Sequence, residues 1–115
     1  MDRVVVGVLG GGVVGASARW AIGRLDWSTS VTLIVVNTVG SFILGGVVAR
    51  WEDREHPMRL ALGVGACGGF TTFSGLAVEI AGQLDRGDVV SGLWLGALSV
   101  LLGGAAFLGG RRVLP

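Results

Sequence analysis

A short polar stretch, Gly68-Gly69-Phe70-Thr71-Thr72-Phe73-Ser74, interrupts an apolar and uncharged run that extends from Leu60 to Val78. Backbone that leaves the helix at the depth of a bilayer cannot hydrogen-bond to lipid. It persists only where it is buried in protein or lines a path for water or ions. Backbone carbonyls freed at such a break are hard oxygen ligands, which suit a small cation. The stretch is therefore a candidate ion site.

Uncharged polar side chains in the apolar runs extend the same chemistry. They are Asn37, Thr71, Thr72, Ser74 and Ser99. Amide and hydroxyl groups can donate hydrogen bonds to a desolvated anion without adding a competing negative charge. The ring edges of Phe73 and Phe70 are electropositive and can face an anion as well. Hydrogen bonds between helices, together with phenyl rings that face lipid, account for these residues equally well.

Two charged residues lie close to these polar groups. Arg19 ends the first apolar run, and Glu79 follows Ser74 by about one helical turn. Each side chain can reach toward the headgroups or pair locally, and each can also serve an ion path as a structural or vestibule group. The sequence leaves both interpretations open.

The residue sets that enzymes use are missing from the sequence. The single His56 lies in a charged linker, and the single Cys67 has no second cysteine to pair with. Two matches to G-x-G-x-x-G occur, at 10–15 and 63–68, but a dinucleotide site needs a βαβ unit and an acidic residue about 20 positions beyond the loop. The first acid after Gly15 is Asp26, which comes too early. We therefore predict that the chain is not an enzyme.

The composition is that of a membrane protein. Of the 115 residues, 51% are hydrophobic and 15% are charged, whereas a soluble domain has about 25% charged residues. About 20 apolar residues, rising about 1.5 Å each, cross the hydrocarbon layer. We predict an all-α integral membrane protein, a single domain over 1–115, with four spans at about 4–23, 29–50, 60–82 and 89–110. The third span is broken, and because no soluble domain remains we expect lipid around the chain and no nucleic-acid partner.

Small residues recur at intervals of four in three of these spans. They are Gly7, Gly11 and Gly15, then Ser41 and Gly45, then Gly92 and Gly96. In lipid, helices associate where small residues let their backbones come close. This pattern predicts tight helix contacts, including contacts with a second subunit.

Three motifs together resemble one known family. Gly11-Gly12-Val13-Val14-Gly15-Ala16-Ser17-Ala18-Arg19, Val36-Asn37-Thr38-Val39-Gly40-Ser41-Phe42-Ile43-Leu44-Gly45 and the stretch 68–74 look like the three signatures of the CrcB/Fluc fluoride channels. They occur in that family's order, one in each of the first three spans. The similarity extends over essentially all of the chain.

This resemblance implies a passive fluoride-selective channel in a bacterial inner membrane, which lets cytoplasmic fluoride leave the cell. It also implies an antiparallel, dual-topology dimer with two anion paths at the interface and a structural sodium ion at the centre. The sodium would be held by the backbone carbonyls of Gly68 and Thr71 from both subunits. Asn37 would face an anion path, and Phe73 would supply a ring edge to it. Further hydroxyl groups would come from Thr72, Ser74 and Ser99.

The chain departs from the family pattern at two positions. The family stretch usually continues Thr-Thr-Phe-Ser-Thr-Phe, whereas Gly75-Leu76 stands here in place of Thr-Phe. Ser99 is followed one turn later by Gly103, where a second hydroxyl is expected. At least one anion path of a homodimer would therefore lack usual ligands. Some family members pair two different subunits, and this chain could be one of such a pair.

The arginines are unevenly divided between the two ends of the spans. The end that holds the termini and the middle linker carries six, which are Arg3, Arg50, Arg54, Arg59, Arg111 and Arg112. The other end carries three, Arg19, Arg24 and Arg86. Such a bias favours cytoplasmic termini and a separately encoded partner of opposite orientation. A homodimer that tolerates a difference of three remains open.

Two other functions compete with a channel. A small proton-coupled multidrug exporter also has four spans and can form a dual-topology dimer, but it needs a titratable carboxylate deep in the membrane. Glu79 is the sole candidate for that role, and it lies near a helix end. The second competitor is a structural subunit that conducts nothing.

Overall fold

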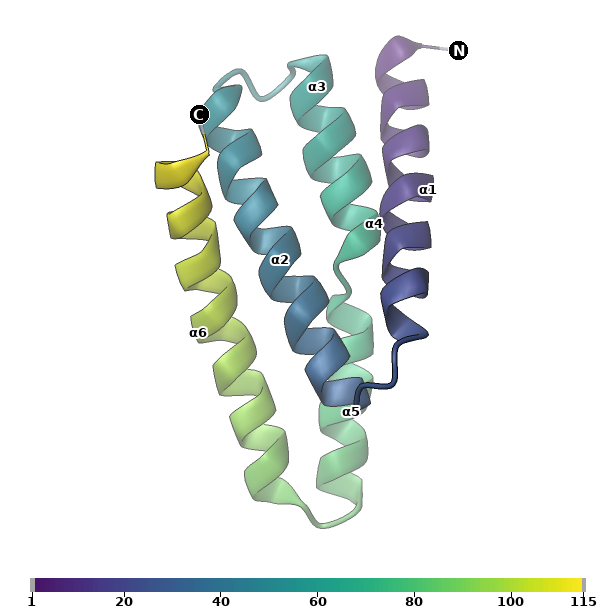
Figure 1. The fold of residues 1–115 in the computed structure, drawn as a ribbon, viewed down its shortest axis with the longest axis vertical. Coiled ribbons are helices and arrows are strands. Elements are labelled where there is room, and N and C mark those ends of the chain that lie inside the picture. Colours follow the sequence, from purple (N-terminus) through teal and green to yellow (C-terminus); the bar gives the residue numbers. More distant parts are fainter. Residues whose placement is uncertain (1, 115) are drawn as a thin grey trace.

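The computed structural model describes residues 2–114, which form helices and no strands. Four helical segments are long and apolar enough to cross a membrane, and they are α1 (Arg3–Gly23), α2 (Thr29–Arg50), the composite third segment (Pro57–Asp85) and α6 (Val89–Val113) (Figure 1). The first two agree with the predicted spans. The third begins before the predicted Leu60 and continues past Gly82, and the fourth continues past Gly110. Without strands there is no βαβ unit in 2–114, and this overturns the dinucleotide-site alternative.

The third segment consists of several short helices. In chain order they are α3 (Pro57–Arg59), the π-helix η1 (Leu60–Cys67), α4 (Gly68–Phe70) and α5 (Phe73–Asp85). In η1 the hydrogen bonds run over five residues, so that the Gly68 N–H donates to the Gly63 carbonyl. The sequence predicted no π-helix.

The break lies later in the chain than the glycine pair predicts. Gly68 keeps helical angles, with φ −61° and ψ −39°, and the helix continues to Phe70. The chain becomes extended only at Thr71 and Thr72, where ψ is 160° and 108°. Glycine permits a non-helical backbone but does not impose one, whereas β-branched threonine fits extended backbone well. The expectation of a glycine-opened break is therefore corrected to a break at the two threonines.

Polar side chains set the start of the long helices. Ser28 Oγ accepts from the Val31 N–H at 3.2 Å, and Asp88 Oδ1 accepts from the Ser91 N–H at 3.4 Å. Such caps satisfy backbone donors that a helix leaves free at its first turn. Before α6 the chain turns through Gly87, whose φ of +82° favours glycine. α2 and α6 consequently begin where the sequence predicts.

The helices pack through glycines, as the four-residue repeats predict. A Cβ added to Gly15 of α1 would collide with the Ala66 carbonyl of η1. A Cβ added to Gly45 of α2 would collide with the Phe107 carbonyl of α6. Because these backbones touch, the small-residue rows make helix contacts within the subunit. Many large apolar side chains stay exposed on the outside of the bundle, as expected of helices that face a membrane.

This packing predicts a strong difference between two glycines of α1. Gly15→Ala must displace η1, and overpacking of this kind costs about 1–3 kcal/mol. Gly10 has open space where a Cβ would lie, so Gly10→Ala is its matched control. We expect Gly15→Ala to lower the thermal unfolding temperature of the protein in detergent and Gly10→Ala to leave it unchanged. Equal unfolding temperatures for the two variants would contradict this packing.

The two ends of the bundle differ in what they carry. α1 begins and α6 ends beside the α2–α3 linker, whereas the α1–α2 and α5–α6 linkers lie at the opposite end (Figure 1). The termini and the middle linker therefore share one side, as the four-span arrangement predicts.

Candidate ion site

Asn37 of α2 holds the break in the third segment. The Thr72 N–H donates to Asn37 Oδ1 at 2.8 Å, and Asn37 Nδ2 donates to the Thr72 carbonyl at 3.2 Å. In an uninterrupted helix the Thr72 N–H would donate to the Gly68 carbonyl four residues earlier. One amide side chain therefore replaces the helical partners of an unwound residue. This is the condition under which a broken helix is tolerated inside a membrane.

Two further side chains satisfy backbone groups around the break. Arg19 Nε donates to the Gly69 carbonyl at 3.1 Å, and the Arg19 side chain is half-buried. Thr72 Oγ1 accepts from the Gly75 N–H at 3.0 Å and so caps α5. Arg19 thus has a structural contact at the break, and the Thr72 hydroxyl is occupied as a helix cap.

Two backbone carbonyls at the break are set free by these contacts. The Thr71 N–H donates to the Cys67 carbonyl at 2.9 Å and the Thr72 N–H to Asn37, so neither donates to the carbonyl of Gly68. The Thr71 carbonyl loses its helical partner because the Gly75 N–H turns to Thr72 Oγ1. The Thr71 hydroxyl donates to the Cys67 carbonyl at 2.9 Å and stabilises this arrangement. The freed pair comes from the two residues in which the sequence predicts cation ligands.

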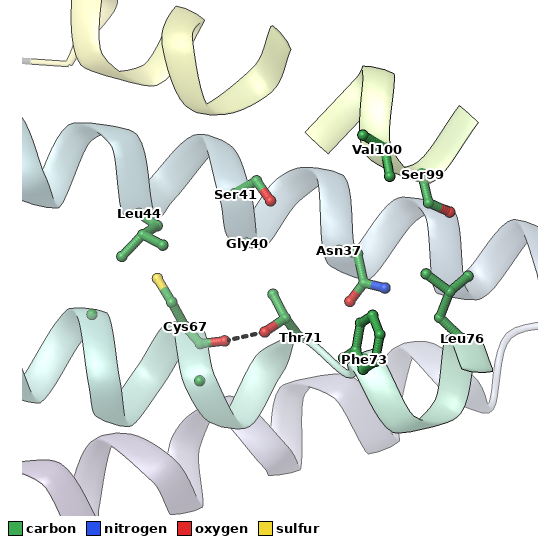
Figure 2. A pocket seen from close by; sticks show the side chains of 12 residues that line it. Asn37, Gly40, Ser41, Leu44, Cys67, Thr71, Phe73, Leu76, Ser99 and Val100 are labelled. Carbon is green, nitrogen blue, oxygen red and sulfur yellow. Dashed lines mark hydrogen bonds between the residues drawn. The ribbon is translucent and has the colours of Figure 1, made fainter. Parts of the chain in front are cut away.

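A cavity of about 360 Å³ lies beside the break, between α2, the third segment and α6 (Figure 2). Its polar and aromatic lining consists of Asn37, Ser41, Thr71, Phe73 and Ser99. Ser99 Oγ is buried and has no hydrogen-bond partner among the described residues. Phe73 is 83% exposed in the single subunit. Three of the five predicted anion-path residues, Asn37, Phe73 and Ser99, therefore line one cavity together with Gly68 and Thr71.

The other predicted site residues lie elsewhere. Thr72 faces a second cavity of about 530 Å³, which Arg19 also lines. Ser74 is exposed and lines neither cavity, although its Oγ lies 3.4 Å from Thr72 Oγ1. Glu79 accepts a hydrogen bond from Ser30 Oγ at 3.4 Å, away from both cavities. The hydroxyl groups of the predicted path are thus divided between two faces of the break.

Ser41 is a cavity residue whose four-residue spacing from Gly45 predicts helix packing alone. It follows Asn37 by four residues on α2, and residues four apart share a helix face. This spacing was the available signal, and it places the Ser41 hydroxyl in the cavity wall (Figure 2).

These features define a small membrane protein with four spans, the third of which is broken at a polar cavity. The family model described as CrcB-like protein, Camphor Resistance (CrcB), matches residues 6–111. The chain belongs to this family and is a multi-pass bacterial membrane protein.

Three curated relatives carry the name fluoride-specific ion channel FluC. The protein of Gloeobacter violaceus is 42% identical over 92% of this chain and 90% of its own length. The proteins of Rhizobium johnstonii and Leifsonia xyli subsp. xyli are 34% and 32% identical, over 90% and 94% of this chain and 90% and 81% of their own lengths. The family resemblance inferred from the three motifs is confirmed. Neither the family nor these names favour the multidrug exporter.

Proposed function

We propose that this chain is a subunit of a fluoride-selective channel that lets cytoplasmic fluoride leave the cell across the bacterial inner membrane. The observation that carries the proposal is the break clamped by Asn37, beside a cavity that contains Phe73 and the unpartnered hydroxyl of Ser99. The identity of the chain to relatives named as fluoride channels supports it. Passive conduction involves no covalent step, so the chain is not an enzyme.

The chemistry of the cavity suits an anion that has lost its water. Its lining residues include hydroxyl and amide groups and no carboxylate. Asn37 uses one Nδ2 hydrogen on the Thr72 carbonyl and keeps the other. Neutral donors compensate for lost hydration without fixing a negative charge nearby, and a ring edge adds a weakly positive contact.

The membrane potential supplies the driving force. An inside-negative potential is worth about 2.3 kcal/mol per charge per 100 mV, and it drives an anion outward. Hydrogen fluoride enters an acid-exposed cell uncharged, and the neutral cytoplasm traps it as fluoride. A passive path is therefore sufficient for export.

The proposed functional unit is an antiparallel pair of subunits. Phe73 is 83% exposed and the cavity is open in the single subunit, so a second surface is needed to enclose a dehydrated ion. A small residue that remains free on the outside, such as Gly104, allows close approach of another helix.

A sodium ion at the centre of this pair is the proposed cofactor. The carbonyls of Gly68 and Thr71 fit the ion, because they are hard oxygen ligands freed at the end of a broken helix. Two oxygens are too few for one cation, and a symmetric partner doubles them. When bound, the ion supplies a fixed positive charge close to the anion paths.

Removal of sodium should therefore weaken the assembly. A ligand that binds only the folded state raises stability with its concentration, by about 2.7 kcal/mol at a hundredfold excess over the dissociation constant. We expect the thermal unfolding temperature of the purified protein to rise with sodium concentration and to stay constant with N-methylglucamine at the same ionic strength. Identical unfolding curves in the two salts would contradict a bound sodium ion.

The orientation of the subunit is a separate proposal, in which the termini lie in the cytoplasm. Arg19 donates to a carbonyl at the break and Arg59 to two carbonyls of its own linker, so each counts less as a linker charge. Two arginines, Arg24 and Arg86, then oppose five at the other end. This difference favours one orientation and a separately encoded partner with the opposite orientation.

Labelling of a linker cysteine tests this orientation. In Glu55→Cys, a membrane-impermeant thiol reagent should label the protein only after the cells are permeabilised, because the middle linker lies inside. Cys67 is buried and serves as the internal control in the unsubstituted chain. Partial labelling before permeabilisation that rises to complete labelling afterwards would instead support a homodimer of both orientations.

Fluoride efflux from liposomes tests the function itself. The chain is reconstituted alone and together with a second family member from the same genome, with chloride efflux as the control. Fluoride efflux that far exceeds chloride efflux, in either arm, is the expected result. Efflux of both anions alike would overturn the selectivity, and no efflux in either arm would overturn the channel. Fluoride efflux from the chain reconstituted alone would show that one kind of subunit is enough. Efflux only in the presence of the second family member would show that two kinds are needed.

A further inference from the structure

The cavity wall contains one hydroxyl that the motifs give no role, that of Ser41. Ser41 lies one helical turn beyond Asn37 on the same face of α2, about 6 Å along the axis. Both residues line the same cavity as Ser99 of α6 (Figure 2).

The turn of α6 that faces Ser41 has no side chain there, because the residue is Gly103. Gly103 follows Ser99 by four residues, so α6 presents the two positions on one face. A Cβ built on Gly103 would lie 3.5 Å from Ser41 Oγ, an ordinary van der Waals distance. A side chain at 103 and the Ser41 hydroxyl would therefore occupy the same part of the structure.

We propose that Ser41 supplies the second hydroxyl of the anion path, in the place that α6 leaves empty at Gly103. The inference rests on the proposed fluoride conduction and adds a residue to it. After Asn37 and Ser99, the next hydrogen-bond donor for the ion is then the Ser41 hydroxyl of α2 and not a side chain of α6. The unpartnered Ser99 hydroxyl shows that this wall of the cavity holds donors that the subunit does not use internally.

A hydroxyl moved from one helix to the other provides the test. Ser41→Ala removes the donor, and the Ser41→Ala/Gly103→Ser double variant returns a hydroxyl to nearly the same point from α6. Thr38→Ala is the matched control, because Thr38 lies one turn from Ser41 on α2 and lines neither of the two cavities. Fluoride efflux is measured in the assembly that conducts, with size-exclusion elution as the check on folding.

A hydrogen bond to a charged group is worth about 1.5–3 kcal/mol, so Ser41→Ala should slow fluoride efflux roughly tenfold or more. The double variant should recover to within about threefold of the unsubstituted protein, and Thr38→Ala should leave efflux unchanged. Unchanged efflux in Ser41→Ala would overturn the inference. So would a defect in a correctly assembled Ser41→Ala that Gly103→Ser does not relieve. If the unsubstituted protein fails to conduct fluoride, the proposed function falls and this inference falls with it.

Discussion

Replacing Asn37 with leucine should abolish fluoride conduction and destabilise the subunit. Leucine has nearly the shape of asparagine but leaves the Thr72 N–H and carbonyl without the partners that lie at 2.8 and 3.2 Å. A buried polar group left unsatisfied costs about 1–3 kcal/mol, so two cost about 2–6 kcal/mol. In lipid the backbone can recover these bonds only by rewinding the helix through Thr71 and Thr72, which would remove the freed carbonyls as well.

Two further variants distinguish the loss of the Asn37–Thr72 hydrogen bonds from a general loss of packing. Gln83→Leu also removes a buried amide from a span, but it breaks only one hydrogen bond, from Gln83 Nε2 to Ser30 Oγ at 3.2 Å, and Gln83 lines neither cavity. It should therefore destabilise the subunit less than Asn37→Leu and leave conduction unchanged. Asn37→Asp keeps the acceptor for the Thr72 N–H and loses the donor to the carbonyl, while it adds a negative charge in the cavity wall. We therefore expect Asn37→Asp to fold better than Asn37→Leu and still to conduct poorly.

Thermal unfolding in detergent and fluoride efflux from liposomes give the two readouts. Asn37→Leu should lower the unfolding temperature and reduce efflux at least on the order of a hundredfold, since about 1.4 kcal/mol is a factor of ten. If Asn37→Leu unfolds and conducts like the unsubstituted protein, Asn37 neither holds the break nor serves the path.

The spans are predictable from the sequence because charged residues and helix-capping residues mark their ends. Ser28 and Asp88 stand directly before the uncharged segments, and their side chains begin α2 and α6 where the sequence predicts. The register of the third span is harder to predict. The residues Leu60–Cys67 suit an α-helix as well as the π-helix they form, and the glycines of α1 that contact this segment lie about 50 residues away.

The site was predictable in its residue types and only partly in its geometry. Hydroxyl, amide and phenyl groups in apolar runs identify Asn37, Phe73 and Ser99 correctly as neighbours of one cavity. The partner of Asn37, however, is the backbone of Thr72, 35 residues away, and no local pattern contains that contact. Thr72 stays out of the cavity for a local reason. Threonine at the start of a helix satisfies the first turn, and this local demand directs the Thr72 hydroxyl to the Gly75 N–H.

Replacing Phe73 with isoleucine should strongly reduce conduction while it leaves the subunit folded. Phe73 is 83% exposed in the subunit, so the change costs little packing there. Among the described residues it is the only aromatic ring in the cavity wall, and Leu76 beside it has no ring edge (Figure 2). A contact between two aromatic rings is worth about 0.5–1.5 kcal/mol, and we take the same scale for the ring edge against the ion. Both copies of the ring are lost at once in a homodimer.

We expect fluoride efflux to fall roughly tenfold for each ring that lines a path, with thermal unfolding unchanged. Phe107→Ile is the matched control, since Phe107 lies on α6 and lines neither of the two cavities. Leu76→Phe in the Phe73→Ile protein extends the test, because it places a ring in the same wall one turn along α5. Recovery of efflux there would show that a ring edge is what the path requires. Full efflux in Phe73→Ile would mean that hydroxyl and amide donors carry the ion without an aromatic contact.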